Sequence, residues 1–241
     1  SAGGVHSHIE HLIAIITWCD ENDIKKVYLH AFTDGRDSPP ASAEEYFTQL
    51  EAAAKETSVS LGILSVSGRH FAMDRDKNWD RIKQAYSVMT GASAKTVSSV
   101  RESIKSTYAK QQSDEFLEPV IILDDVKKEL VTLSDGDALL FFNIRPDRMR
   151  QIVTAFTNRR FTKFKTKKYK HFKVYTMTDY DPTLNVEVIF PEPPITNHLS
   201  EIFSKKGLKH CHIAETQKYA HVTYFFNGGT EKPYKGEIRV L

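Results

Sequence analysis

The chain has 241 residues, and its 40% hydrophobic content is enough for the core of one large domain, or of one domain and part of another. The net charge of +2 excludes a strong overall field for nucleic acid or membranes. Cys19 and Cys211 are too few and too far apart for a disulfide framework or a CxxC metal site. No wholly apolar run, including 138–142, is longer than five residues, which is too short to cross a bilayer, and we expect a cytoplasmic protein.

The first half of the chain alternates predicted helices and strands. Apolar residues at helical spacing predict a helix that begins near Ile9. A strand is predicted over 26–31, and Ser42 with Glu45 forms a capping-box signature for a helix that ends near Glu56. The other elements expected here are strands at 59–66 and 120–123 and helices near 76–89 and 94–110.

The second half continues the alternation. A strand is expected over 138–143, and Pro146, at a first helical position, predicts a helix from there to about Asn158. Pro191, Pro193 and Pro194 predict a linker. The remaining expected elements are strands at 172–177, 186–190, 209–214 and 221–226 and a helix near 198–206. The pattern favours an α/β protein, a three-layer sandwich with a mainly parallel sheet flanked by helices.

Arginines follow three of the predicted strands. Arg36 is in the loop 34–37, Arg69 in the loop 67–69 with Arg75 in the same strand-to-helix connection, and Arg145 and Arg148 are in the loop 143–148. Ligands of parallel α/β sheets bind at the carboxyl ends of strands, so five arginines in such places favour an anion site. They suit a small substrate with a phosphate and a carboxylate. For each loop alone, a surface salt bridge is an equally simple interpretation, for example between Arg148 and Asp147.

Two other patterns have a functional and a structural interpretation. His6, His8 and His11 have a spacing that zinc could use, but no local carboxylate or cysteine completes the set; a histidine that hydrogen-bonds a ligand oxygen is the better functional interpretation of His6. The segment 159–173 has eight Lys or Arg and no acidic residue, interleaved with aromatic residues. It could bind RNA, although such a run is more often a solvated face.

Several strings together resemble the cofactor-independent phosphoglycerate mutases, and the resemblance covers essentially the whole chain. Each string alone is modest evidence, but their order and approximate spacing match the family as well. The strings are Gly3-Gly4-Val5-His6-Ser7-His8, His30-Ala31-Phe32-Thr33-Asp34-Gly35-Arg36-Asp37, Gly68-Arg69, Ala72-Met73-Asp74-Arg75-Asp76, Trp79-Asp80-Arg81, Asp114-Glu115-Phe116, Phe142-Asn143-Ile144-Arg145-Pro146-Asp147-Arg148, Tyr175-Thr176-Met177-Thr178 and Ala214-Glu215-Thr216-Gln217-Lys218-Tyr219-Ala220-His221-Val222-Thr223.

The resemblance implies an isomerase of glycolysis and gluconeogenesis that interconverts 3-phosphoglycerate and 2-phosphoglycerate through a phosphoserine. Such enzymes have an alkaline-phosphatase-like domain with a serine nucleophile and two divalent metal ions, usually Mn²⁺. A second domain, inserted in the first, holds the glycerate. Residues 1–192 would be this inserted domain, incomplete at its N-terminus, and 193–241 would be the first returning, orphaned α/β segment of the phosphatase domain.

The resemblance also implies roles for individual residues. Asp37 would be the general acid/base that moves the hydroxyl proton. Arg36, Arg69 and Arg75 would hold the glycerate carboxylate and hydroxyls, and His6 would contact the hydroxyl or phosphate region. The phosphate ligands would be Arg145, Arg148 and, from the phosphatase domain, Lys218.

The chain departs from the family pattern in two respects. Ala2 stands where the family usually has Asp. No nucleophilic serine and no metal ligands can be assigned, so we expect the chain to bind no metal and to be inactive without the missing phosphatase-domain segments. We also expect a monomer with no nucleic-acid partner. The alternative is a stand-alone phosphometabolite-binding module that lacks catalysis.

Overall fold

A computed structural model describes residues 1–123, 130–191, 193 and 195–241. They form two compact units, Ser1–Pro191 and Glu192–Leu241, and each is considered by itself. Pro194, one of the three prolines of the predicted linker, lies outside the described residues. No helix among the described residues is both long and apolar enough to cross a bilayer.

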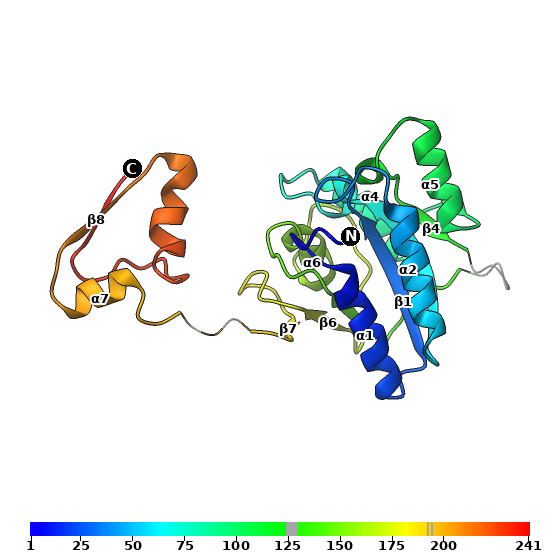
Figure 1. Cartoon of the computed structure of the whole chain (residues 1–241), viewed down its shortest axis with the longest axis horizontal. Coiled ribbons are helices and arrows are strands. Elements are labelled where there is room, and N and C mark those ends of the chain that lie inside the picture. Colours follow the sequence, from blue (N-terminus) through cyan, green and yellow to red (C-terminus); the bar gives the residue numbers. More distant parts are fainter. Residues whose placement is uncertain (124–129, 192, 194) are drawn as a thin grey trace. The chain divides into compact units, whose positions relative to one another are not determined.

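The order of elements in the first unit agrees with the predicted α/β alternation (Figure 1). They are α1 (Ile9–Glu21), β1 (Lys26–Thr33), α2 (Ala43–Lys55), β2 (Ser60–Gly68), α3 (Arg69–Ala72), α4 (Trp79–Met89), β3 (Thr96–Val97), α5 (Val100–Ala109), η1 (Asp114–Phe116), β4 (Val120–Ile122), β5 (Ala138–Phe141), α6 (Arg150–Thr157), β6 (Lys173–Thr176) and β7 (Glu187–Val188).

The strands of this unit form two sheets instead of the single sheet that the sequence predicts. One sheet has the order β1-β2-β4-β3 and the other has the order β5-β6-β7. All pairings are parallel except that of β2 with β4. The predicted class of mainly parallel strands flanked by helices is therefore confirmed, with β1 and β5 each at an edge of its sheet.

Alternation along β1 explains why helices cover both faces of the larger sheet. Leu29 packs with Leu12 and Ile16 of α1 on one face. Phe32 points to the other face, where it joins the largest core cluster together with Ile82 of α4. Helix α6 and strands β5 and β6 contribute to the same cluster. The core thus holds the strand ends, and the loops that leave them, in fixed positions.

One predicted helix cap and one predicted helix start are wrong. The second helix is not capped by the Ser42 side chain, which donates to the Pro39 carbonyl. Its first amides instead donate to the buried Asp114, which is distant in sequence and which local spacing cannot reveal. The helix predicted from Pro146 begins only at Arg150, because Asp147 and Arg148 form side-chain contacts of their own in a preceding turn.

The predicted helix over 94–110 is also shorter than expected. Thr96 and Val97 form β3 beside β4, and α5 begins at Val100. Ser99 is its N-cap and accepts from the amide of Glu102, whose carboxylate in turn accepts from the Ser98 amide. The arrangement differs from a capping box in that the amide donor is Ser98, the residue before the N-cap, and it separates the strand from the helix.

The second unit contains α7 (Leu199–Lys205), β8 (His210–Ile213), η2 (Thr216–Lys218), η3 (His221–Phe225) and β9 (Glu237–Val240). The strand predicted over 221–226 is wrong, because η3 is a π-helical turn. Thr223 and Asn227 are buried on one side of it, a spacing that fits a helix, and tertiary burial overrides the β propensity of the aromatic residues. The partner of β8 is β9, in parallel pairing.

Asp114 connects three parts of the first unit and should be important for its stability. Its carboxylate is 1% exposed and accepts from the amides of Ser42 and Ala43 and from the Tyr108 hydroxyl, at 2.8, 2.9 and 2.6 Å. Replacing it leaves three buried donors unsatisfied, so Asp114→Ala should lower the free energy of unfolding by about 3 kcal/mol.

The measurement is urea unfolding followed by the fluorescence of Trp18 and Trp79, which both lie in the first unit. The control is Asp80→Ala, which removes an exposed carboxylate from the first turn of α4 and should cost about 0.5 kcal/mol. Equal losses for the two variants would contradict the role of Asp114.

Candidate functional site

The candidate site lies where loops leave the carboxyl ends of β1, β2 and β5. The loop after β1 contains Asp34 and Asp37, α3 after β2 begins with Arg69, and the segment after β5 contains 143–148. The N-terminal segment joins them, because the carbonyl oxygen of His6 accepts from the amide of Ile144 at 2.7 Å. Four chain segments distant in sequence therefore meet at one place.

Glycines allow these segments to approach closely. Gly35 has a φ of +66°, and a Cβ atom there would lie 2.7 Å from the amide nitrogen of Glu115. A Cβ atom on Gly3 would collide with the carbonyl oxygen of Asp37. Gly35 is required both for backbone conformation and for space, and Gly3 for space, which explains the glycines beside the predicted site residues.

Arg69 is the centre of the site. It is 3% exposed, and its Nη1 atom donates to Asp34 Oδ1 at 2.5 Å and to Asp37 Oδ2 at 2.6 Å. Burial alone would raise the pKa of Asp34, but hydrogen bonds from the Asp37 amide and from Arg69 outweigh it and hold that pKa below its ordinary value. The buried guanidinium thus fixes the loop after β1, including Asp37, relative to β2.

His6 lies against this pair in a neutral form. Its Nε2 atom is 3.2 Å from Arg69 Nη2 and 3.7 Å from Asp37 Oδ2. Burial, assisted by the positive charge of Arg69, lowers the pKa of His6 to about 4. Since arginine can only donate, Nε2 must accept and the ring proton must be on Nδ1. Asp147 Oδ1 lies 3.9 Å from that atom.

Asp147 joins two arginines from different loops. Its carboxylate accepts from Arg75 Nη1 at 2.6 Å and from Arg145 Nε at 2.9 Å, and both arginines are about half exposed. Burial alone would raise the pKa of Asp147, but the hydrogen bond from Arg75 and the charge of Arg145 lower it. The carboxylate is therefore ionised and holds both guanidinium groups at the mouth of the site.

Arg148 has no carboxylate partner among the described residues. Its Nη1 atom donates to the Met73 carbonyl at 3.0 Å. Burial lowers the pKa of its guanidinium, and the like charges of Arg69 and Arg75 add to this effect. The salt bridge to Asp147 considered from sequence is not present. A partly buried cation among like charges would be stabilised by a bound anion.

Seven of the eight predicted site residues are in the first unit, and the structure brings them together. Arg36 is the most exposed of them and reaches Glu115 Oε1 at 3.4 Å. Lys218 is exposed in η2 of the second unit, which is considered by itself. The seven residues are His6, Arg36, Asp37, Arg69, Arg75, Arg145 and Arg148.

Sequence reasoning did not give roles to the carboxylates that organise the arginines. Asp34 was seen only as part of a turn, and Asp147 only as a partner for Arg148. Asp74 is 4% exposed and accepts from the amide of Asn78 at the start of α4 and from the Gln151 side chain. The sequence feature that could have identified these carboxylates is the alternation of Asp and Arg within single loops.

The other two patterns have structural explanations. His8 is the N-cap of α1, where its Nδ1 atom accepts from the Glu10 amide, and the described residues contain no group of three His, Cys, Asp or Glu side chains suited to a metal ion. In the segment 159–173, Phe161, Phe164 and Phe172 pack against the largest core cluster. Rings packed there are not free to stack on bases.

Comparison with known proteins identifies the family. The model of the family described as BPG-independent PGAM N-terminus (iPGM_N) matches residues 1–182. The chain is 45% identical to the 2,3-bisphosphoglycerate-independent phosphoglycerate mutase 1 of Methanosarcina barkeri over 244 residues, which is 100% of this chain and 47% of that protein. It is likewise 45% identical to the 2,3-bisphosphoglycerate-independent phosphoglycerate mutase of Clostridioides difficile, over 100% of this chain and 47% of that protein.

A solved structure agrees with this result. Leishmania mexicana phosphoglycerate mutase, crystallised at low cobalt concentration, matches with a TM-score of 0.82 and 31% identity, over 100% of this chain and 46% of that chain. The chain thus spans about half the length of the relatives it matches. By sequence, by fold and by the match over residues 1–182, it belongs to the family of 2,3-bisphosphoglycerate-independent phosphoglycerate mutases.

Proposed function

We propose that the chain is the phosphoglycerate-binding part of an enzyme that interconverts 3-phosphoglycerate and 2-phosphoglycerate through a phosphoserine, in glycolysis and gluconeogenesis. The observation that carries the proposal is the meeting of cationic side chains from three strand-end loops around Asp37 and His6. Such a cluster suits a ligand with two anionic groups. Because the chain spans about half of its relatives, catalysis belongs to the whole protein.

The two units would have different places in that protein. We assign residues 1–192 to the inserted phosphoglycerate-binding domain, incomplete at its N-terminus, and residues 193–241 to the first returning segment of the phosphatase-like domain. The division of the chain into units at Pro191 supports this boundary. Lys218 would then join the substrate phosphate from the phosphatase-like domain once that domain is complete.

The anionic groups of the substrate would be divided among the arginines. Arg145 and Arg148 would bind the phosphate, since Arg148 is partly buried and has no carboxylate to neutralise it. Arg36 and Arg75 would hold the carboxylate and hydroxyls of the glycerate. Arg69 would hold the same end of the ligand and, through its 2.6 Å contact, orient Asp37.

Asp37 would transfer the hydroxyl proton. When the glycerate hydroxyl attacks the phosphoserine, its proton would pass to the Asp37 carboxylate, and in the reverse step Asp37 would return it to the leaving oxygen. Arg69 holds this carboxylate in one orientation. The neutral His6, with its ring proton on Nδ1, would hydrogen-bond the hydroxyl or phosphate region.

The metal chemistry would come from outside this chain. We propose that the whole protein uses two divalent ions, Mn²⁺ as the first choice. The described residues do not fit such a site, since no three His, Cys, Asp or Glu side chains are grouped for it, and we derive no step through a metal. We also propose that the whole protein is a cytoplasmic monomer without a nucleic-acid partner.

Substrate binding can be tested by calorimetric titration of the chain with 3-phosphoglycerate. The double variant Arg145→Ala/Arg148→Ala should lose at least 100-fold in affinity, because each charge-assisted hydrogen bond contributes about 1.5–3 kcal/mol. The control Arg159→Ala/Arg160→Ala removes the same charge from exposed positions and should bind as the unchanged chain does. Equal losses in both variants would indicate attraction by net charge alone, against the proposed site.

The protonation of His6 provides a second test, by NMR titration of its ring with His6→Gln for assignment. The midpoint should lie near pH 4 in the free chain, because burial and Arg69 disfavour the cation. Saturating 3-phosphoglycerate should raise the midpoint, since a nearby anion stabilises the charged ring. Sodium chloride at equal ionic strength is the control, and a midpoint that 3-phosphoglycerate leaves unchanged would place His6 outside the ligand site.

Turnover should require the rest of the protein. The purified chain should not convert 3-phosphoglycerate to 2-phosphoglycerate, with or without Mn²⁺, whereas the full-length protein that contains it should. The Methanosarcina barkeri relative is the positive control. Mutase turnover by the isolated chain would contradict the proposal that catalysis requires the rest of the protein. A full-length protein that binds the substrate without turnover would favour the alternative of a phosphometabolite-binding module.

A further inference from the structure

The proposed function gives no role to one basic segment of the first unit. This segment is 159–173, between α6 and β6, and it contains eight Lys or Arg and no acidic residue. All eight cationic side chains are exposed, whereas the four aromatic rings of the segment are half-buried. Phe161, Phe164 and Phe172 pack against the largest core cluster. The basic segment therefore presents its charges to solvent and its rings to the core.

Contacts with the rest of the first unit fix the backbone of the basic segment. The amide of Lys167 donates to the Tyr86 hydroxyl at 2.9 Å. Lys170 is held from two sides, because its amide donates to Asp135 Oδ1 at 2.9 Å and its carbonyl oxygen accepts from the Gly136 amide at 2.9 Å. The lysines thus lie on an ordered surface, and a ligand that binds them does not have to order the backbone first.

Most charges of the basic segment have no acidic partner among the described residues. Only Lys173 of the eight lies within salt-bridge distance of a described carboxylate, at 3.2 Å from Glu187 Oε1. Of the 33 Lys or Arg of the chain, eight are in this segment, which leaves 25 against the 31 Asp or Glu of the whole chain. A concentration of positive charge on an otherwise acidic chain forms a local field that attracts anions.

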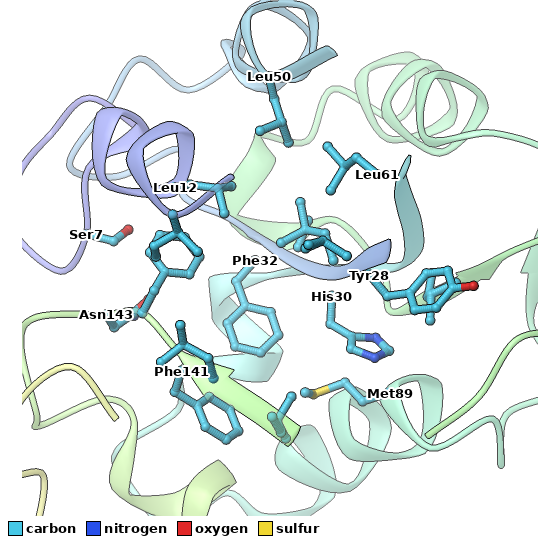
Figure 2. A pocket seen from close by; sticks show the side chains of 18 of the residues that line it. Ser7, Leu12, Tyr28, His30, Phe32, Leu50, Leu61, Met89, Phe141 and Asn143 are labelled. Atoms are coloured by element: carbon cyan, nitrogen blue, oxygen red, sulfur yellow. The ribbon is translucent and has the colours of Figure 1, made fainter. Parts of the chain in front are cut away.

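The basic segment leads into the end of the smaller sheet that is opposite to the candidate site. Strands β5 and β6 are parallel, and Lys173 begins β6 beside the first residue of β5. The site segment 143–148 follows the other end of β5. Figure 2 shows Asn143 near Ser7 at that end, in agreement with the backbone hydrogen bond that joins the two segments. A ligand bound where the basic segment enters β6 would therefore leave the candidate site open.

The side chains of the basic segment distinguish among anionic partners. Its packed rings cannot stack on the bases of single-stranded RNA. Its exposed residues are all charged or polar, so it presents no exposed apolar side chain for insertion into a bilayer. A long duplex or a membrane surface would also meet the acidic remainder of the chain, which repels it. A short acidic polypeptide fits best, because it needs to cover the basic segment alone.

We propose that the basic segment 159–173 is a docking surface for a short acidic segment of another protein, one with consecutive Asp or Glu side chains. Its carboxylates would pair with the exposed lysines. Each pair is weak by itself because it is exposed to solvent, but several pairs on one extended polypeptide act together. Binding should therefore weaken as salt is added. This inference does not depend on the proposed activity.

The first measurement is the fluorescence anisotropy of a labelled twelve-residue polyglutamate peptide, titrated with the 241-residue chain at low salt. The variant Lys165→Gln/Lys168→Gln/Lys170→Gln should bind the peptide at least tenfold more weakly, because it removes three exposed charges from the basic segment. Lys167 is kept because its Nζ atom lies over the Tyr169 ring, 4.9 Å from the centroid. Absence of peptide binding by the unchanged chain would overturn the proposal.

A matched control removes the same charge elsewhere. The variant Lys55→Gln/Lys83→Gln/Lys105→Gln changes exposed lysines on α2, α4 and α5 and should bind the peptide as the unchanged chain does. Equal losses in the two triple variants would show attraction by net charge alone and would overturn the proposal. The double variant Arg145→Ala/Arg148→Ala should also keep peptide binding, and its loss would place the peptide at the candidate site instead.

Further probes test the class of partner. A polyglutamine peptide of the same length should not bind, because it has the same length and no charge. A twelve-nucleotide uridine RNA and vesicles of phosphatidylserine in phosphatidylcholine, each at the same concentration of negative charge, should bind more weakly than polyglutamate. Tighter binding of the RNA or of the vesicles, or equal binding of polyglutamine, would overturn the proposal.

Discussion

The candidate site depends on one buried cation. Arg69 is 3% exposed and forms ion pairs with Asp34 and Asp37 while it touches His6. Removing one partner of a buried pair costs about 3–5 kcal/mol, because the remaining charge stays desolvated. The ion pairs of Arg69 therefore attach the loop after β1 to the start of α3. The position of Asp37, the proposed proton carrier, follows from this attachment.

The arginines differ in how they are neutralised, and the difference has a chemical consequence. Asp147 holds Arg75 and Arg145, whereas Arg148 has a carbonyl oxygen as its described partner. An anion that enters the site meets one incompletely neutralised guanidinium and two that a carboxylate already orients. The electrostatic interaction with the anion is therefore most favourable at Arg148. The ion pairs with Asp147 limit the entropic cost of ordering the Arg75 and Arg145 side chains. Preorganised charge of this kind is usually the largest contribution to catalysis.

The sequence was sufficient for features that local chemistry determines. Arginines behind apolar runs predicted strand-end loops, and seven predicted site residues meet there. Features that depend on distant contacts could not be predicted. Asp114 replaces the Ser42 cap from more than seventy positions away, the contacts of Asp147 and Arg148 delay the helix expected at Pro146, and the burial of Thr223 turns a β-like run into a helix.

The division into two sheets connects the fold with the site. The loops after β1 and β5 each deliver charged residues to the same edge, and the N-terminal segment delivers His6 between them. His6 therefore meets Arg69 and Asp37 on one side and Asp147 on the other, and its burial at this place lowers its pKa.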